Sequence, residues 1–106
     1  MRELSDTFMK DLLDTDGLLN PVLERIKQDH TLMLAIRKDY INIYYRGGNI
    51  LKVEEQGDGT YSAEFNKKYN HLGIPSPSLP SKISNKADSE TWIDSFQDLK
   101  RIMDCY

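Results

Sequence analysis

The sequence predicts an α+β fold in which a four-stranded antiparallel β-meander, in strand order 1-2-3-4, carries two short N-terminal helices and one C-terminal helix packed on one face. Three observations support this prediction. Residues 31–66 alternate in hydropathy and are rich in β-branched and aromatic side chains, which is typical of strands. Turn residues separate the runs. Apolar residues at helical spacing appear only before and after them. The expected strands span about 31–37, 40–46, 49–55 and 60–66.

The register of the first hairpin follows from the requirement that paired residues share a face. A slip of one residue would bury the wrong set of side chains. A two-residue turn at Lys38 and Asp39 meets this requirement, because every resulting pair on one face is apolar. The predicted pairs are Leu32 with Tyr45, Leu34 with Ile43, and Ile36 with Ile41.

The second hairpin requires a choice between two loops. A two-residue turn at Gly47 and Gly48 would mix apolar and polar faces, whereas a three-residue loop that also includes Asn49 restores the apolar pairing. Asn49 tolerates the left-handed backbone conformation that such a loop needs at its last position. We expect the three-residue loop. The predicted pairs of this second hairpin are Tyr45 with Leu51, Ile43 with Val53, and Tyr44 with Lys52.

Gly57-Asp58-Gly59 is expected to close the third hairpin, whose register the sequence leaves open.

Two short helices are expected before the strands. Ser5 can cap the first helix, and Gly17 is expected to stop it. Asn20 as N-cap and Pro21 at the first helical position open the second helix. Neither helix is long enough to be stable alone, so both must dock on the apolar face of the sheet. The predicted helices span about 5–14 and 20–29.

The C-terminal third consists of a loop and one helix. Residues 67–88 hold three of the four prolines and many serines, which predict a loop of polyproline character. A broad apolar stripe at helical spacing then predicts a helix over about 89–105. We expect Trp92 and Phe96 in this stripe to be buried against the apolar sheet face. The stripe is unfinished at Tyr106, which we expect to reflect either a helix packed to its tip or the N-terminal domain of a longer protein.

Composition limits the number of domains, the kinds of partner and the compartment that we expect. The 106 residues, of which 39% are hydrophobic, predict one domain over 1–106. The formal charge of −3 is spread along the chain, which removes a strong electrostatic reason to expect a nucleic-acid or membrane-surface protein. Cys105 is the only cysteine, so an internal disulfide is excluded. With no apolar run near membrane-spanning length and no signal-peptide pattern, we expect a cytoplasmic protein without membrane association.

No recognisable catalytic or metal-binding constellation occurs in the sequence. His30 and His71 are far apart from each other and from Cys105, so no metal-ligand spacing exists. The pattern of restriction-endonuclease-like nucleases, an Asp and a Glu-x-Lys on antiparallel strands, fits poorly because the third strand carries Lys52-Val53-Glu54 in the reverse order. We therefore expect no catalytic residues, no metal and no cofactor.

The polar face of the sheet is the candidate binding surface. Tyr40, Tyr44 and Arg46 on the second strand and Lys52 on the third are expected there, where they could stack nucleobases or anchor a protein. The alternative is an ordinary solvated face. We expect a non-catalytic interaction or scaffold domain of bacterial type, whose partner is another protein or the remainder of a longer chain. The alternative is a nucleic-acid-binding domain, or an accessory domain of a nucleic-acid-processing enzyme.

Overall fold

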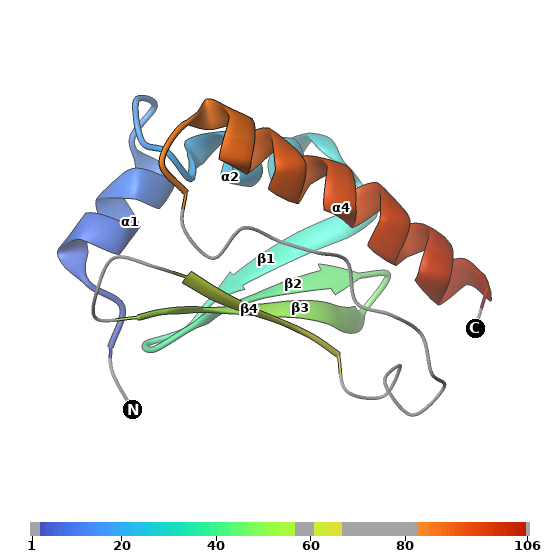
Figure 1. Ribbon diagram of the computed structural model, residues 1–106. Coiled ribbons are helices and arrows are strands. Elements are labelled where there is room, and N and C mark those ends of the chain that lie inside the picture. The colour runs from blue at the N-terminus through green and yellow to red at the C-terminus, as the bar shows by residue number, and fades with distance from the viewer. Residues whose placement is uncertain (1–2, 57–60, 67–82, 106) are drawn as a thin grey trace.

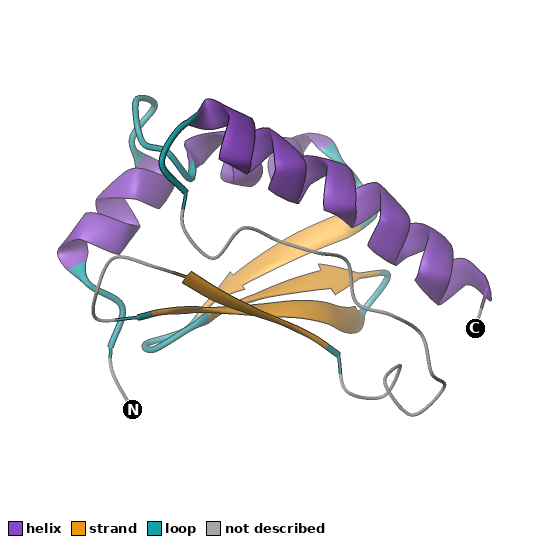
Figure 2. Ribbon diagram, viewed as in Figure 1, coloured by secondary structure: helices purple, strands orange, loops and turns teal. Residues whose placement is uncertain are grey.

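Four antiparallel strands form one sheet in the order β1-β2-β3-β4, and three helices cover one of its faces (Figures 1 and 2). The fold class expected from the sequence is confirmed. The computed structural model describes residues 3–56, 61–66 and 83–105, so most of the predicted 67–88 loop lies outside the described residues. The elements are α1 Asp6–Leu13, α2 Asn20–Gln28, β1 Leu32–Ile36, β2 Ile41–Tyr45, β3 Gly48–Glu55, β4 Tyr61–Phe65 and α4 Lys86–Cys105.

The start of α1 is capped as the sequence predicts. Ser5 has extended backbone geometry, and its Oγ accepts a hydrogen bond from the Phe8 amide at 3.0 Å. The same Ser5 donates from its amide and its hydroxyl to the Glu55 carboxylate, at 2.9 and 2.7 Å. These bonds join the beginning of α1 to the end of β3, so the first helix is fixed at one end of the sheet.

The connection between α1 and α2 differs from the prediction. Leu19, not Asn20, is the N-cap of α2, and Asn20 is its first residue. The buried Asn20 side chain instead donates to the Leu12 carbonyl at 3.0 Å, so it satisfies the C-terminal end of α1. Gly17 does not stop α1, which ends at Leu13. An added Cβ at Gly17 would lie 2.1 Å from the Asp11 carbonyl oxygen, so glycine is needed there for close backbone packing.

The predicted register of the first hairpin is confirmed. Leu32 lies opposite Tyr45, and Leu34 lies opposite Ile43. Arg37 donates its amide hydrogen to the Tyr40 carbonyl across the turn, at 2.8 Å. The requirement for apolar pairs on one face was sufficient here, because both strands are regular and no bulge shifts their register.

The predicted register of the second hairpin is wrong. The turn consists of Arg46 and Gly47, with φ of 50° and 82°, and a two-residue hairpin turn with positive φ at both positions matches the twist of the strands. Asn49 belongs to β3 and lies opposite Tyr44. A β-bulge at Ile50, which has no partner on β2, then brings the apolar residues back to one face. The observed pairs are Tyr45 with Gly48, Ile43 with Leu51, Asn42 with Lys52, and Ile41 with Val53.

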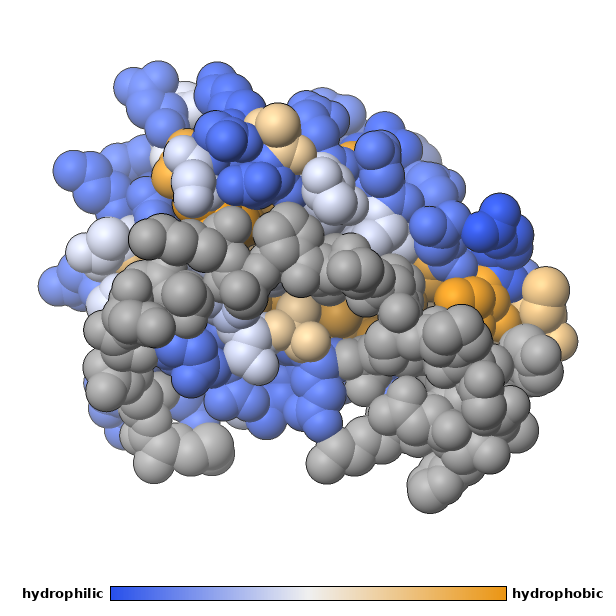
Figure 3. All heavy atoms as spheres, viewed as in Figure 1, coloured by the Kyte–Doolittle hydropathy of each residue, from blue (hydrophilic) through white to orange (hydrophobic). Residues whose placement is uncertain are grey.

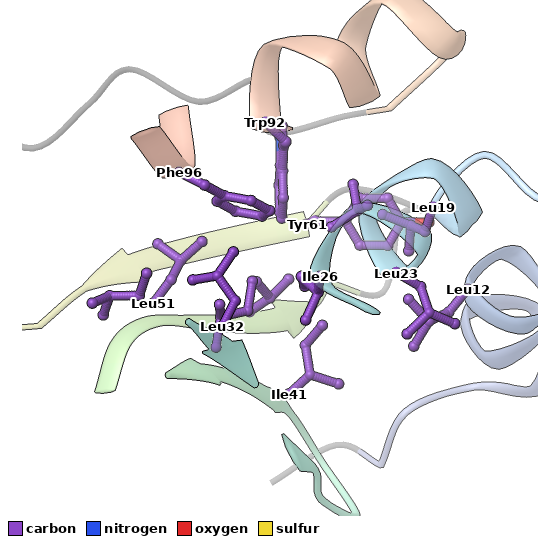
Figure 4. Packing of buried hydrophobic residues seen from close by; sticks show 14 of the residues in the cluster. Leu12, Leu19, Leu23, Ile26, Leu32, Ile41, Leu51, Tyr61, Trp92 and Phe96 are labelled. Carbon is purple, nitrogen blue, oxygen red and sulfur yellow. The ribbon is translucent and has the colours of Figure 1, made fainter. Parts of the chain in front are cut away.

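The hydrophobic core lies between the sheet and the helices. Trp92 and Phe96 of α4 have 1% and 0% of their surfaces exposed and point toward the sheet (Figure 4), as the sequence predicts. α4 begins at Lys86, three residues before the expected start. Buried residues of α1 and α2 complete the cluster, including Leu12, Leu23 and Ile26.

The surfaces of the helices that face away from the sheet are polar. Figure 3 shows hydrophilic residues over the outer side of the helices and hydrophobic ones near the C-terminal end of α4. Within the described ranges, no helix combines the length and the apolar character that crossing a bilayer requires.

Candidate functional site

Tyr40 and Lys52, two residues of the predicted binding surface, are brought together by the structure. The Lys52 ammonium lies 4.7 Å from the centre of the Tyr40 ring. It also forms an ion pair of 3.1 Å with Glu54, and this hydrogen-bonded carboxylate raises the pKa of Lys52. The positive charge of Lys52 is therefore already balanced by Glu54 on the same strand.

Tyr44 belongs to a short network of amides on the same sheet face. Asn42 donates to the Tyr44 hydroxyl at 3.3 Å, and Asn49 donates to the Asn42 side-chain oxygen at 3.4 Å. Asn42 is buried, and Tyr44 is half-buried. Contrary to the prediction, Lys52 lies opposite Asn42 and not opposite Tyr44, because the bulge shifts the register.

Arg46 lies apart from the other three predicted site residues. It is in the hairpin turn, and its guanidinium lies 5.2 Å from the centre of the Tyr45 ring. Tyr45 is buried under α4, where its hydroxyl donates to Asp104 at 2.9 Å. The structure therefore brings Tyr40 and Lys52 together, and Tyr44 lies beside them on the same face. Arg46 lies instead against the ring of Tyr45, on the helix side of the sheet.

A second surface, which was not predicted from the sequence, lies between α2 and β1. An open groove of about 540 Å³ runs along this line, and we call it the α2–β1 groove. Large hydrophobic side chains of the described residues are exposed at three positions, and all three line this groove: Leu13 at 53%, Met33 at 58% and Ile36 at 43%. Such a gathering of exposed apolar groups marks an interaction surface more often than scattered single residues do.

The strand that borders the groove is an edge of the sheet. Among the described strands, β1 pairs only with β2. In an antiparallel ladder, the residues of one set direct their N–H and C=O groups to the partner strand, and the alternate set directs them away. Because Arg37 bonds to Tyr40 and Thr31 bonds to Arg46, the set directed outward comprises Leu32, Leu34 and Ile36.

Three ionisable residues line the groove: Asp29, Lys27 and His30. Asp29 accepts a hydrogen bond of 2.7 Å from Lys100 of α4, and bonds from the Thr31 amide and hydroxyl. Burial alone would raise the pKa of Asp29, but these hydrogen bonds outweigh it and hold the pKa well below its usual range. Lys27 and His30, the other polar lining residues, are exposed.

A signal for the groove was present in the sequence. Residues 32–36 are all apolar, so β1 lacks the alternation of apolar and polar residues that an antiparallel strand shows when one face meets water. An apolar strand at a sheet edge can pair with a strand of another chain, because its outward N–H and C=O groups are unpaired. The sequence could not reveal that Leu13 and α2 would border the same strand, since this depends on how the helices dock.

In the described part of the chain, no three His, Cys, Asp or Glu side chains are grouped closely enough to hold a metal ion. Cys105 is exposed near the end of α4. Comparison of the chain with protein-family models, with curated proteins and with solved structures finds no match.

Proposed function

We propose that this chain is a non-catalytic interaction or scaffold domain that binds a protein partner in the α2–β1 groove. The observation that carries the proposal is the gathering of Leu13, Met33 and Ile36, each about half exposed, in one groove. Soluble monomeric proteins rarely expose large contiguous apolar patches, and such patches often mark interaction sites. A partner that did so would convert this exposed apolar area into binding energy.

The size of the apolar contribution is consistent with a reversible interaction. Complete burial of a large apolar side chain contributes about 1.5 to 3 kcal/mol relative to full exposure. Since each of the three residues is about half exposed, covering them contributes about 1 kcal/mol per residue, or about a hundredfold in affinity altogether. Further contacts are needed for a stable complex, and the free edge of β1 offers them.

The nucleic-acid-binding alternative receives support from the pairing of the Tyr40 ring with Lys52, since aromatic rings beside cations can stack on bases. Other features count against it. Lys52 is engaged by Glu54, Arg46 lies against Tyr45, and Glu64 lies opposite Lys52 on the same face. Carboxylates near the tyrosines repel a phosphate backbone. We therefore favour the groove over the outer face.

We propose the cytoplasm as the site of action. Cys105 is the only cysteine of the chain and is exposed. In an oxidising compartment an exposed lone thiol tends to form disulfides with other molecules, whereas a reducing compartment keeps it free.

Selection of a displayed library of random twelve-residue peptides on the whole chain tests the proposed function. We expect selected peptides to bind the wild type and to lose about thirtyfold in affinity with the double variant Met33→Ser, Ile36→Ser, because two half-exposed apolar side chains are removed. Lys52→Ser, on the outer face and two strands away from β1, is the control and should bind normally. Thermal unfolding verifies that each variant is folded. Peptides that bind the groove variant as tightly as the wild type would refute the proposed function.

A further inference from the structure

We propose that the partner in the α2–β1 groove is an extended segment that pairs with β1 as a fifth strand, carries apolar residues at alternate positions and is flanked by acidic residues. This inference deepens the proposed function and rests on it. It specifies the conformation and the charge of the partner, neither of which follows from an apolar groove alone.

The main chain of β1 supplies the first reason. The outward groups of Leu34 and Ile36 have no hydrogen-bond partner among the described residues, whereas the Leu32 amide already donates to the Asp29 carbonyl at 3.1 Å. A partner strand would therefore pair with the Leu32 carbonyl and with both main-chain groups of Leu34 and Ile36. A helix in the groove satisfies its own main chain and leaves these groups without partners.

The side chains around β1 supply the second reason. In a strand, successive side chains point to opposite faces. Leu34 lies on the helix side of the sheet, opposite Ile43, and Met33 lies on the outer side, opposite Tyr44. Alternate residues of an added strand would thus enter the groove toward Leu23 and Ile26 of α2, while the residues between them would lie beside Met33.

The charges around the groove indicate the flanks of the partner. The chain has a formal charge of −3, yet the exposed ionisable residues of the lining, Lys27 and His30, are basic types. Lys27 makes an ion pair of 3.7 Å with Glu24, but both side chains are exposed, so this pair contributes little and leaves Lys27 accessible to a partner. Arg37 follows Ile36, is exposed, and has no ion-pair partner among the described residues. The one acid of the lining, Asp29, is neutralised by Lys100. Asp or Glu residues at the ends of the partner segment would complement these groups.

Two observations on the selected peptides test the inference. Apolar residues should recur at every second position, with Asp or Glu near the ends, and affinity should fall as salt is raised because exposed charges are screened. Apolar residues at spacings of three and four would indicate a bound helix and would overturn the inference, while groove-dependent binding would leave the proposed function intact.

A pair of variants at Ile36 tests the hydrogen bonds. Proline removes only an N–H that points away from β2, so it is tolerated on an edge strand, whereas alanine keeps the N–H and removes the side chain. A paired strand predicts that Ile36→Pro binds the selected peptide about tenfold more weakly than Ile36→Ala does. Equal affinities would overturn the inference.

Amide hydrogen exchange gives an independent readout on the wild-type chain, in case Ile36→Pro disturbs the hairpin. The amides of Leu34 and Ile36 should exchange at least about tenfold more slowly in the peptide complex than in the free chain. Amides at Met33 and Ala35 already face β2 and serve as internal controls. Unchanged exchange at Leu34 and Ile36 in a saturated complex would overturn the inference. A wild-type chain that is dimeric by light scattering and becomes monomeric with Ile36→Pro would also overturn it, since the occupant would be a second copy.

Discussion

Lys100 Nζ lies 2.7 Å from Asp29 Oδ2, and this ion pair joins α4 to the loop that leads from α2 into β1. The two side chains are only 16% and 15% exposed, so the pair is shielded from water more than the surface pairs are. Lys100 also lies 5.4 Å from the centre of the Tyr45 ring. The end of the groove near Asp29 is thus anchored to the last helix.

Replacement of Asp29 by asparagine should lower the free energy of unfolding by about 1 to 3 kcal/mol at neutral pH, because Lys100 and Thr31 lose a charged acceptor. Urea denaturation measures this difference. The control is Asp98→Asn, which breaks a more exposed pair with Arg101 and should change stability by less than about 0.5 kcal/mol. Equal effects of the two substitutions would contradict the structural role of Asp29.

The effect of Asp29 should depend on pH in a defined direction. Its pKa in the folded chain is depressed below the ordinary value of 3.8, so its stabilising contribution is present above about pH 4 and is lost as the pH falls toward the folded pKa. The difference in stability between wild type and Asp29→Asn should therefore shrink steadily as the pH falls from about 5 toward 2. A difference that stays constant over this interval would be inconsistent with the depressed pKa.

Replacement of Phe96 by alanine should cost about 3 to 5 kcal/mol, through lost transfer energy and an unfilled cavity in the core. Phe96 is fully buried between α4 and the sheet. The neighbouring Gln97 is exposed on the same helix, so Gln97→Ala is the control and should be nearly neutral. A loss below about 1 kcal/mol for Phe96→Ala would mean that α4 is only loosely docked.

The corrected register of the second hairpin can be tested at two residues. Arg46 has a positive φ and Asn49 lies in β3, so Arg46→Gly should change stability by less than about 0.5 kcal/mol while Asn49→Gly lowers it by about 1 to 2 kcal/mol. Chemical denaturation of both variants provides the comparison. The three-residue loop would give the reverse order, because Asn49 would then occupy the left-handed position.

Sequence patterns predicted the register of the first hairpin but not that of the second. The β1–β2 register was predictable because Leu34 and Ile43 belong to regular strands of alternating faces. The β2–β3 register was not, because the bulge at Ile50 adds a residue that alternation does not reveal, and because arginine seldom adopts the left-handed conformation seen at Arg46.

The candidate sites were predictable to a smaller extent. The tyrosines and Lys52 were placed on the polar sheet face from their positions in the strands, and the structure brings Tyr40 and Lys52 together. The groove was missed because Leu13 and Ile36 are distant in sequence and line the same groove only because α1 packs on α2 and α2 packs on β1. Tertiary packing, and not local pattern, creates that surface.

Tyr61 should make the fold sensitive to high pH. Burial, together with the nearby charge of Asp11 and the 3.3 Å hydrogen bond to it, raises the pKa of Tyr61 to about 12 from 10.0. Its contribution to stability is present below pH 10 and is lost as the pH rises toward 12. Tyr61→Phe should therefore lose less stability than wild type does over this interval, as measured by urea midpoints. Parallel losses in the two proteins would argue against the raised pKa.

The central claim is that the α2–β1 groove, and not the outer sheet face, binds the partner. The most direct test is NMR chemical-shift mapping of the whole chain during titration with a peptide selected on the wild type. We predict that the largest shifts occur at Leu13, Ile26, Met33 and Ile36, with little change at Tyr40 and Lys52. Shifts concentrated instead at Tyr40, Tyr44 and Lys52, with the groove residues unchanged, would contradict the claim.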